Sequence, residues 1–238
     1  MRNWVVGAAV AALALAGCSA SVPGRGSAAQ PQLCPAAGGD PARLAACVVA
    51  DLDRYWTGRV GEPVALRVSV DPAPQAVHRT CRSFLALGTA FYCPADRRAY
   101  LTRALVERDR RQFGDRLPYA LAVVIAHEAG HRVQFAVQEP KLDADGDPAS
   151  RVVEQQADCL AGSWAEGAAR RWLVDPAAFR AVYAREMQIV SALEPPPGSG
   201  LDSYDEVATH GTPAQRLAAF DRGATGADPA RACALRRG

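Results

Sequence analysis

The residues best suited to chemistry are two histidines and a glutamate within five positions, His127-Glu128-Ala129-Gly130-His131. On an α-helix, side chains four residues apart lie on the same face, one turn from each other. The imidazoles of His127 and His131 can therefore bind one metal ion, and zinc is the ion that the His-Glu-x-x-His pattern typically binds. Glu128 would face the open coordination position, where it can take a proton from a zinc-activated water molecule.

The alternative interpretation is a pair of histidines satisfied within a helical core. The chain has only 4 histidines in 238 residues, so a chance match to this motif is expected roughly 0.002–0.003 times. The residues immediately before the motif are uncharged, as a buried metal-binding helix requires. The pattern therefore predicts a zinc site.

A third ligand must come from elsewhere in the chain. A metzincin would have Gly at 134 and His at 137, but Gln134 and Val137 stand there, which excludes that class. The next expected helix carries the remaining candidates, Glu154, Asp158 and Glu166. Glu154 and Asp158 are four residues apart and share a helix face, whereas Glu166 points elsewhere.

The Glu-x-x-x-Asp spacing on a second helix is the gluzincin arrangement. We expect Glu154 to be the third zinc ligand. We expect Asp158 to accept a hydrogen bond from the second ring nitrogen of a ligand histidine, which fixes the tautomer of that ring.

A calcium site is the competing interpretation of the acidic residues near Glu154. Asp143, Asp145, Asp147 and Glu154 fall at positions 1, 3, 5 and 12 of an EF-hand loop. The sharp turn at position 6 requires Gly, but Pro148 stands there and restricts φ to about −65°. We therefore favour zinc at Glu154 and leave calcium on the loop as the alternative.

Apolar periodicity and capping residues predict the elements that position these groups. A strand is expected over 64–70 and a hairpin over 90–93 and 98–101. The predicted helices cover 41–58, 103–113, 118–138, 148–172, 176–193 and 213–220. The fold class is therefore α+β and zincin-like, predominantly helical with a small N-terminal sheet.

The first eighteen residues have the layout of a secretory signal. Arg2 precedes an apolar run from Trp4 to Ala16, and Leu15-Ala-Gly-Cys18 resembles the lipidation box of bacterial lipoproteins. The run is shorter than the roughly 20 residues that a membrane span needs. We expect Cys18 to carry a lipid anchor on the outer face of the bacterial cell membrane, with a cleaved signal peptide as the alternative. Residues 19–36 are expected to be a flexible tether, followed by one domain over 37–238.

Export would place the other cysteines in an oxidising compartment. Of seven cysteines, six remain once Cys18 is set aside, and none of them form a Cys-x-x-Cys pair. An even number without that motif favours disulfides over a zinc-thiolate site. Closeness in the sequence predicts the pairs Cys34–Cys47, Cys81–Cys93 and, from the remaining two, Cys159–Cys233.

The charge of the chain excludes one class of partner. The 27 Lys and Arg residues nearly balance the 25 Asp and Glu residues, with a net charge of +2. Both signs are scattered along the chain, so there is no basic patch of the kind that binds nucleic acid.

Three segments resemble the bacterial putative neutral zinc metallopeptidase family. They are Ala126-His-Glu-Ala-Gly-His-Arg-Val-Gln134, Glu154-Gln-Gln-Ala-Asp-Cys-Leu-Ala-Gly162 followed by Trp164, and Thr209-His-Gly-Thr-Pro-Ala-Gln-Arg216. Residues 91–96 and 100–101 also look like the family. The chain departs from many members at Ala129 and Arg132, where they have Tyr and His, and these positions affect specificity more than chemistry. The resemblance implies a gluzincin-type peptidase that acts on peptide or protein substrates.

His210 is the only histidine near the C-terminal helix signal, and two roles are open to it. It could satisfy backbone groups at the helix start. Alternatively, Gly211 and the Thr212-Pro213 helix start hold its ring in the zinc cleft, without binding the metal. A donor there would stabilise the oxyanion formed when water attacks a peptide bond, as a distant His or Tyr often does in gluzincins. We predict the second role.

The motif predicts peptide-bond hydrolysis, with Glu128 as general base and then as acid to the leaving amine. The alternative is a non-catalytic, zinc-stabilised envelope lipoprotein that acts as a binding or structural module. Glu128 is not needed to hold a metal ion, and an inert zinc site is more often closed by a fourth protein ligand. The sequence therefore favours the enzyme.

Overall fold

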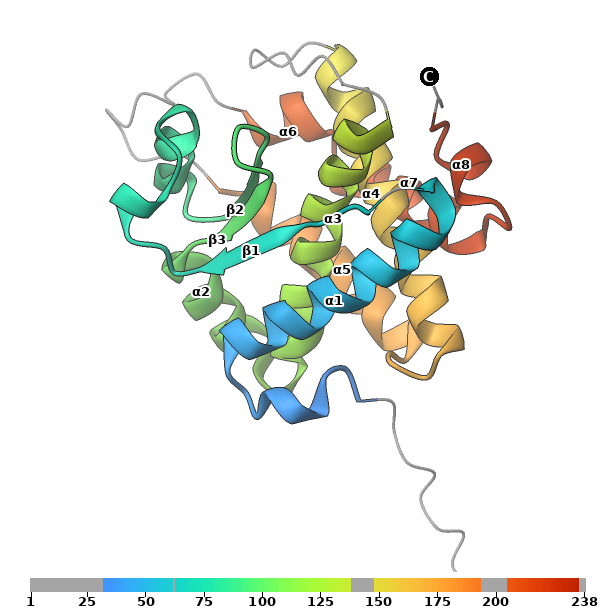
Figure 1. Cartoon of the computed structure of the whole chain (residues 1–238), viewed down its shortest axis with the longest axis horizontal. Helices are drawn as coiled ribbons and strands as arrows, with labels where there is room; N and C mark the ends of the chain where they lie inside the picture. Colours follow the sequence, from blue (N-terminus) through green and yellow to red (C-terminus); the bar gives the residue numbers. More distant parts are fainter. Residues whose placement is uncertain (1–31, 62, 138–147, 194–204, 236–238) are drawn as a thin grey trace, which may run out of the picture. The chain divides into compact units, whose positions relative to one another are not determined.

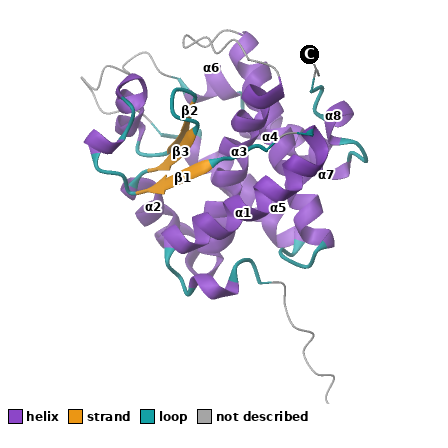
Figure 2. Ribbon diagram, in the orientation of Figure 1, coloured by secondary structure: helices purple, strands orange, loops and turns teal. Residues whose placement is uncertain are grey.

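Helices dominate the part of the chain that the computed structural model describes, which comprises residues 32–61, 63–137, 148–193 and 205–235 (Figures 1 and 2). All of these residues belong to one unit, Pro31–Gly238. A three-stranded sheet is the only sheet among them. The α+β, predominantly helical fold class is confirmed. The signal segment, Cys18 and the acidic loop over 143–147 lie outside the described residues.

The first long helix, α1 (Pro41–Val60), forms as its capping residues predict. The Asp40 side chain accepts from the backbone amides of residues 42 and 43, and Gly61 ends the helix with a positive φ of 83°. Leu33 and Cys34, which fall in the predicted tether, are buried in the core. The folded domain therefore begins a few residues before the predicted boundary at 37.

The sheet consists of β1 (Arg67–Val70), β2 (Ala90–Cys93) and β3 (Arg98–Leu101) in the order β1-β3-β2. The predicted hairpin is present as the antiparallel β2–β3 pair. β1 pairs with β3 in parallel, and it is shorter than the predicted strand. The connection between β1 and β2 includes a 3-10 helix, Arg79–Leu87, that the sequence pattern did not predict. β2 lies at the edge of the sheet, beside the helix that carries the His-Glu-x-x-His motif.

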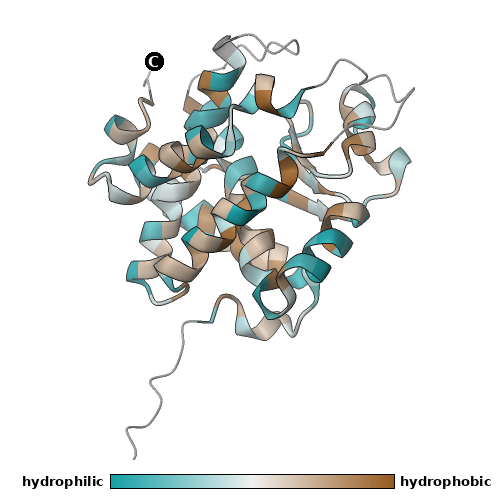
Figure 3. Ribbon diagram, turned by 180° about the vertical axis from the view of Figure 1, so that it is seen from behind, coloured by the Kyte–Doolittle hydropathy of each residue, from teal (hydrophilic) through white to brown (hydrophobic). Residues whose placement is uncertain are grey.

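The motif helix, α3 (Leu117–Val137), passes through the centre of the fold. Every residue from Ala120 to Gln134 is buried, which explains why its sequence is apolar on all sides before the motif. The other long helices have one buried face, and colouring by hydropathy shows hydrophobic and hydrophilic positions alternating along them (Figure 3).

The remaining helices are α2 (Arg103–Phe113), α4 (Pro148–Arg170), α5 (Pro176–Val190), α6 (Glu206–His210), α7 (Pro213–Thr225) and α8 (Pro229–Ala232). Of these, α2, α4 and α5 pack against α3, and α6, α7 and α8 pack against α4. The two shortest, α6 and α8, were not predicted, and α7 continues to Thr225 instead of ending near Phe220. None of the described helices combines the length and apolar character needed to cross a membrane.

Glycines allow the helices that carry the site to approach closely. A Cβ on Gly130 of α3 would lie 2.8 Å from the Cα of Ala157 in α4. A Cβ on Gly162 of α4 would lie 2.0 Å from the carbonyl oxygen of Phe220 in α7, and one on Gly223 would lie 1.8 Å from that of Cys159. α4 is therefore held against both neighbours at backbone contact distance, which brings the functional side chains of three helices together.

All three predicted disulfides are present. Cys34 is bonded to Cys47, Cys81 to Cys93, and Cys159 to Cys233. The last pair joins α4 to the C-terminal segment across 74 residues of sequence.

Candidate active site

His127 and His131 of α3 and Glu154 of α4 form one buried group. The Nε2 atoms of both histidines lie 3.1 Å from Oε2 of Glu154. The ligand atoms of these residues all lie within 4.8 Å of one another, and this is the only such His/Cys/Asp/Glu group among the described residues. The structure thus brings together the three residues predicted to bind zinc.

The other ring nitrogen of each histidine is held by an oxygen. Nδ1 of His127 donates to Oδ1 of Asp158 at 2.8 Å, and Nδ1 of His131 donates to Oε1 of Gln134 at 2.9 Å. These bonds assign the Nδ1 protons, so both Nε2 atoms are free to bind a metal. Asp158 lies where we predicted, while the contact with Gln134 was not predicted.

Burial and neighbouring charges shift the pKa values of His127 and Glu154 in this group. Burial lowers the pKa of His127, but Asp158 and Glu154 outweigh that effect and raise it to about 10. Burial raises the pKa of Glu154, but the neighbouring histidines, above all His131, hold it well below its usual range. These charges favour a protonated His127 beside the carboxylates, and a metal ion that binds here must displace that proton.

Glu128 follows His127 on α3 and is also buried, with 5% of its surface exposed. Its carboxylate forms no hydrogen bond to another described residue, and its oxygens are not among the fully enclosed atoms that lack a partner. Burial raises its pKa, although the charges of His127 and His131 oppose this. A buried carboxylate with a raised pKa and free oxygens has the properties of a general base.

His210, the last residue of α6, reaches the same group from the C-terminal part of the chain. Its Nε2 lies 3.1 Å from Oε2 of Glu154, and its ring centroid lies 6.1 Å from that of His127. Its Nδ1 bonds Oγ1 of Thr209 at 2.8 Å. The start of α7 is capped by Thr212 and Gln215 and does not involve the His210 side chain. The structure therefore places His210 beside the predicted metal ligands but outside the three-residue group.

Arg216 of α7 is the principal site residue that sequence reasoning missed. It lies in a segment used for the family resemblance, but nothing in its spacing indicated a role. The guanidinium donates to both oxygens of Asp158, with Nε–Oδ2 at 3.0 Å and Nη2–Oδ1 at 3.1 Å. Burial raises the pKa of Asp158, but Arg216 and then His127 lower it far below its usual range. Asp158 is therefore an anion when it holds His127.

Two further residues near His131 were also missed. Tyr92 of β2 lies almost parallel to the His131 ring, with centroids 6.5 Å apart. Gln134 entered the sequence argument only as a departure from the metzincin pattern. The Tyr92 contact depends on how α3 packs against β2, so no local pattern could have revealed it. Gln134 is three residues from His131 on the same helix, and that spacing was the available signal.

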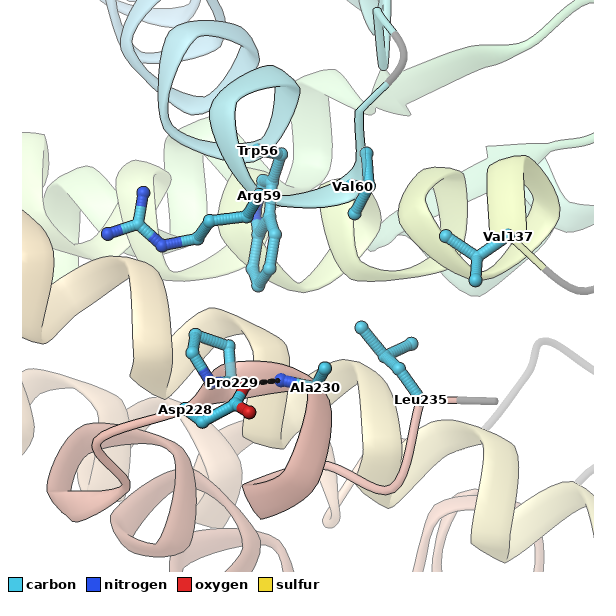
Figure 4. Close-up of a pocket in the computed structure, with 8 residues that line it drawn as sticks. All are labelled: Trp56, Arg59, Val60, Val137, Asp228, Pro229, Ala230 and Leu235. Atoms are coloured by element: carbon cyan, nitrogen blue, oxygen red, sulfur yellow. Dashed lines mark hydrogen bonds between the residues drawn. The ribbon is translucent and has the colours of Figure 1, made fainter. Parts of the chain in front are cut away.

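The remaining candidate, Glu166, lies away from the histidines and pairs with Arg170 at 3.7 Å. A cavity of about 80 Å³ lies between the end of α1 and the C-terminal segment (Figure 4). Trp56, Val60 and Leu235 give it mainly apolar walls, and its lining includes none of the histidines or carboxylates of the buried group. The residues that line this cavity are therefore different from those of the histidine group.

Comparison with known proteins identifies the family. The family described as "Putative neutral zinc metallopeptidase" matches residues 4–235 of the chain. The chain is a member of this family. The match and the buried His–His–Glu group together support zinc as the cofactor.

The similar proteins do not establish an activity. The "uncharacterized protein YpfJ" of Escherichia coli strain K12 is 32% identical over 156 residues, which cover 59% of this chain and 52% of that protein. The "uncharacterized protein Mb2605" of Mycobacterium bovis is 41% identical over 80 residues, covering 32% of this chain and 27% of that protein. The chain therefore spans about half the length of the first relative and less of the second. No solved structure matches the chain.

The donor set fits the zinc that the family name implies. Two imidazole nitrogens and one carboxylate oxygen form the His₂Glu set found in catalytic zinc sites. A hydrogen bond at the far nitrogen orients each ring, as is usual for histidines that bind a metal. His127, His131 and Glu154 are thus the residues that would hold the ion.

Proposed function

We propose that this chain is a zinc-dependent peptidase in which His127, His131 and Glu154 bind the metal and Glu128 is the general base. One observation carries the proposal: Glu128 is buried within reach of the charges of His127, His131 and Glu154, and forms no hydrogen bond to another described residue. A site that only stabilised the fold would not need a buried carboxylate that neither binds the metal nor forms an ion pair.

The residues divide the work of hydrolysis. Bound zinc would supply Lewis acidity, polarising the substrate carbonyl and lowering the pKa of the attacking water. Glu128 takes the proton from that water and returns it to the leaving amine. His210 donates a hydrogen bond to the oxyanion that forms on the former carbonyl oxygen.

The edge strand supports an extended peptide as the substrate. β2 pairs with β3 on one side, and no described strand pairs with its other side. Tyr92 of β2 lies beside His131, so this edge borders the histidine group. An extended peptide can bind such an edge through main-chain hydrogen bonds, which would bring its backbone toward Glu128.

We also propose that the protein is exported and anchored to the outer face of the bacterial cell membrane through Cys18. The lipoprotein-like N-terminus supports this location, and the three disulfides are consistent with an oxidising compartment. Metabolic labelling with a fatty acid should mark the wild type and not Cys18→Ser.

Zinc content and hydrolysis of a denatured protein, measured side by side, test the enzymatic proposal. Wild type should contain about one zinc and cleave the substrate. Glu128→Gln should keep the zinc and lose turnover, whereas His127→Ala and Glu154→Ala should lose both. Glu166→Gln is the matched control, because it makes the same change on α4 away from the site. A wild type that binds zinc but cleaves neither this substrate nor a peptide library would contradict the proposal.

A further inference from the structure

Arg216 is a buried arginine that contacts two carboxylates from different helices. It is 3% exposed. One edge of its guanidinium bonds both oxygens of Asp158 in α4. The remaining nitrogen, Nη1, donates to Oε1 of Glu206 in α6 at 2.9 Å.

Each of these carboxylates also contacts a different histidine of the site. Oδ1 of Asp158 accepts from Nδ1 of His127 at 2.8 Å. Oε1 of Glu206 lies 3.6 Å from Nδ1 of His210, one helical turn further along α6. This is an electrostatic contact, because the hydrogen bond of that nitrogen is to Oγ1 of Thr209 at 2.8 Å. A single guanidinium therefore bonds both carboxylates that contact His127 and His210.

We propose that Arg216 is a positioning residue that sets the orientation of two histidines at once, His127 through Asp158 and His210 through Glu206. Its effect on His127 concerns metal binding alone. Its effect on turnover through His210 rests on the proposed peptidase function.

The shape of the side chain explains why an arginine is needed. The guanidinium is planar and presents its donors in a fixed fork, so it can bind Asp158 with two parallel bonds and Glu206 with a third nitrogen. A lysine ammonium is a point charge and could not hold both carboxylates in these directions. Charge matters as well, because Asp158 is fully buried and, without Arg216, would keep the hydrogen bond from His127 but lose its permanent counter-charge.

The packing of α7 fixes where the guanidinium lies. The backbones of α4 and α7 touch at Gly162 and Gly223, so Arg216 extends from a helix that cannot shift freely against α4. Thr212 and Gln215 form a capping box at the start of α7, directly before Arg216. The fold therefore determines the position of Arg216, and Arg216 in turn determines the positions of the two carboxylates.

Zinc affinity and turnover of Arg216→Lys test the proposal. Zinc affinity, measured by competition with a chromogenic chelator, should fall about 10- to 100-fold, as for other residues that orient metal-binding histidines. The turnover number measured at saturating zinc should also fall, because His210 loses its support. Arg180→Lys is the matched control: Arg180 of α5 forms a similar two-bond pair with Asp221 of α7, but at the surface. It should leave both quantities unchanged.

The two carboxylate variants separate the two routes. Asp158→Asn should weaken zinc binding, whereas Glu206→Gln should lower turnover and leave zinc affinity nearly unchanged. In the Arg216→Lys background, Glu206→Gln should cost less turnover than in the wild type, because the contact that it removes is already disturbed. Equal costs in both backgrounds would overturn the Glu206 route.

The nitrogen NMR signals of the histidine rings provide a readout that does not depend on hydrolysis. Arg216→Lys should shift the ring signals of His127 and His210 and leave those of His78 unchanged. A folded Arg216→Lys protein with wild-type zinc affinity and unshifted rings would overturn the proposal, whether or not the protein is a peptidase. If Arg216→Lys does not fold, Asp158→Asn must shift the His127 signals and Glu206→Gln those of His210. Unshifted signals in those variants would also overturn it.

Discussion

The side-chain oxygen of Gln134 accepts a 2.9 Å hydrogen bond from Nδ1 of His131. The amide of Gln134 is held in turn, because its nitrogen donates to the carbonyl of Val153 at 2.7 Å and to Oε1 of Gln156 at 2.9 Å. Gln156 donates to the carbonyl of Cys233 at 2.8 Å. A chain of amide groups thus connects a predicted metal ligand to the disulfide-bonded C-terminal segment.

Gln134→Leu should lower zinc affinity about 10- to 100-fold, because His131 would lose the oxygen that orients its ring. Chelator competition measures this. The variant should also be less stable by about 1–3 kcal/mol, since the carbonyl of Val153 loses a buried partner. Gln112→Leu, an exposed position on α2, is the control and should change neither quantity. Wild-type zinc affinity in Gln134→Leu would show that His131 does not need this support.

Removing the Cys159–Cys233 disulfide should weaken zinc binding as well as stability. Without it, the Cys233 carbonyl that accepts from Gln156 is no longer covalently linked to α4. The hydrogen bonds that connect Gln156 through Gln134 to His131 should then be less well ordered. Zinc affinity of a Cys159→Ser, Cys233→Ser variant, measured where the protein remains folded, should therefore fall.

Removal of Cys34–Cys47 is the control for that experiment. Chain entropy alone predicts losses of about 4.5 kcal/mol for the pair separated by 74 residues and about 3 kcal/mol for the pair separated by 13. Both variants should therefore melt at lower temperature. Only the variant without Cys159–Cys233 should lose zinc affinity. A loss of the same size in the variant without Cys34–Cys47 would assign the effect to general destabilisation.

His210→Ala should retain zinc and the fold but lose about 10²–10³ in turnover number, because the substrate oxyanion loses a hydrogen-bond donor. Zinc content by elemental analysis and single-turnover kinetics are the measurements. His78→Ala changes the other histidine outside the motif, at an exposed helix start, and should have no effect on turnover. Loss of zinc in His210→Ala would make His210 a metal ligand and not an oxyanion donor.

Glu186 predicts a decrease in stability as pH rises. Glu186 of α5 and Asp109 of α2 are both fully buried and both pair with Arg108. Burial, and then the charge of Asp109, raises the pKa of Glu186 from 4.5 to about 8. Folding therefore favours the protonated carboxyl. The stability that this preference adds is fully present below about pH 4.5 and is lost as pH rises through about 8.

The free energy of unfolding of the wild type should accordingly fall between about pH 5 and pH 8, as measured by urea denaturation. Glu186→Gln keeps the side-chain oxygen for Arg108 but cannot ionise, so it should flatten this slope. It should be more stable than the wild type by about 1–3 kcal/mol at pH 8. Glu166→Gln, in a partly exposed pair, should leave the slope as it is. A slope that persists in Glu186→Gln would assign the pH dependence to other groups.

Local periodicity determined much of the site. His127 and His131 share a helix face because they are four residues apart, and Glu154 and Asp158 share one for the same reason. Pro and capping residues marked the starts of α1, α5 and α7, and closeness in the sequence indicated two of the disulfides. These features depend on neighbouring residues, so the sequence alone was sufficient to predict them.

Only the tertiary structure decided which distant side chains meet. Arg216 lies 58 residues from Asp158 along the chain, and the two meet because glycines let α4 and α7 touch. α6, which positions His210, has five residues and is too short to show helical periodicity. The parallel pairing of β1 with β3 likewise leaves no local pattern, because the residues that pair are separated by a long connection. How elements cross depends on packing summed over the whole core. For this reason helix spacing predicted the His–His–Glu group and Asp158, whereas only the packed structure showed that Arg216 bonds Asp158.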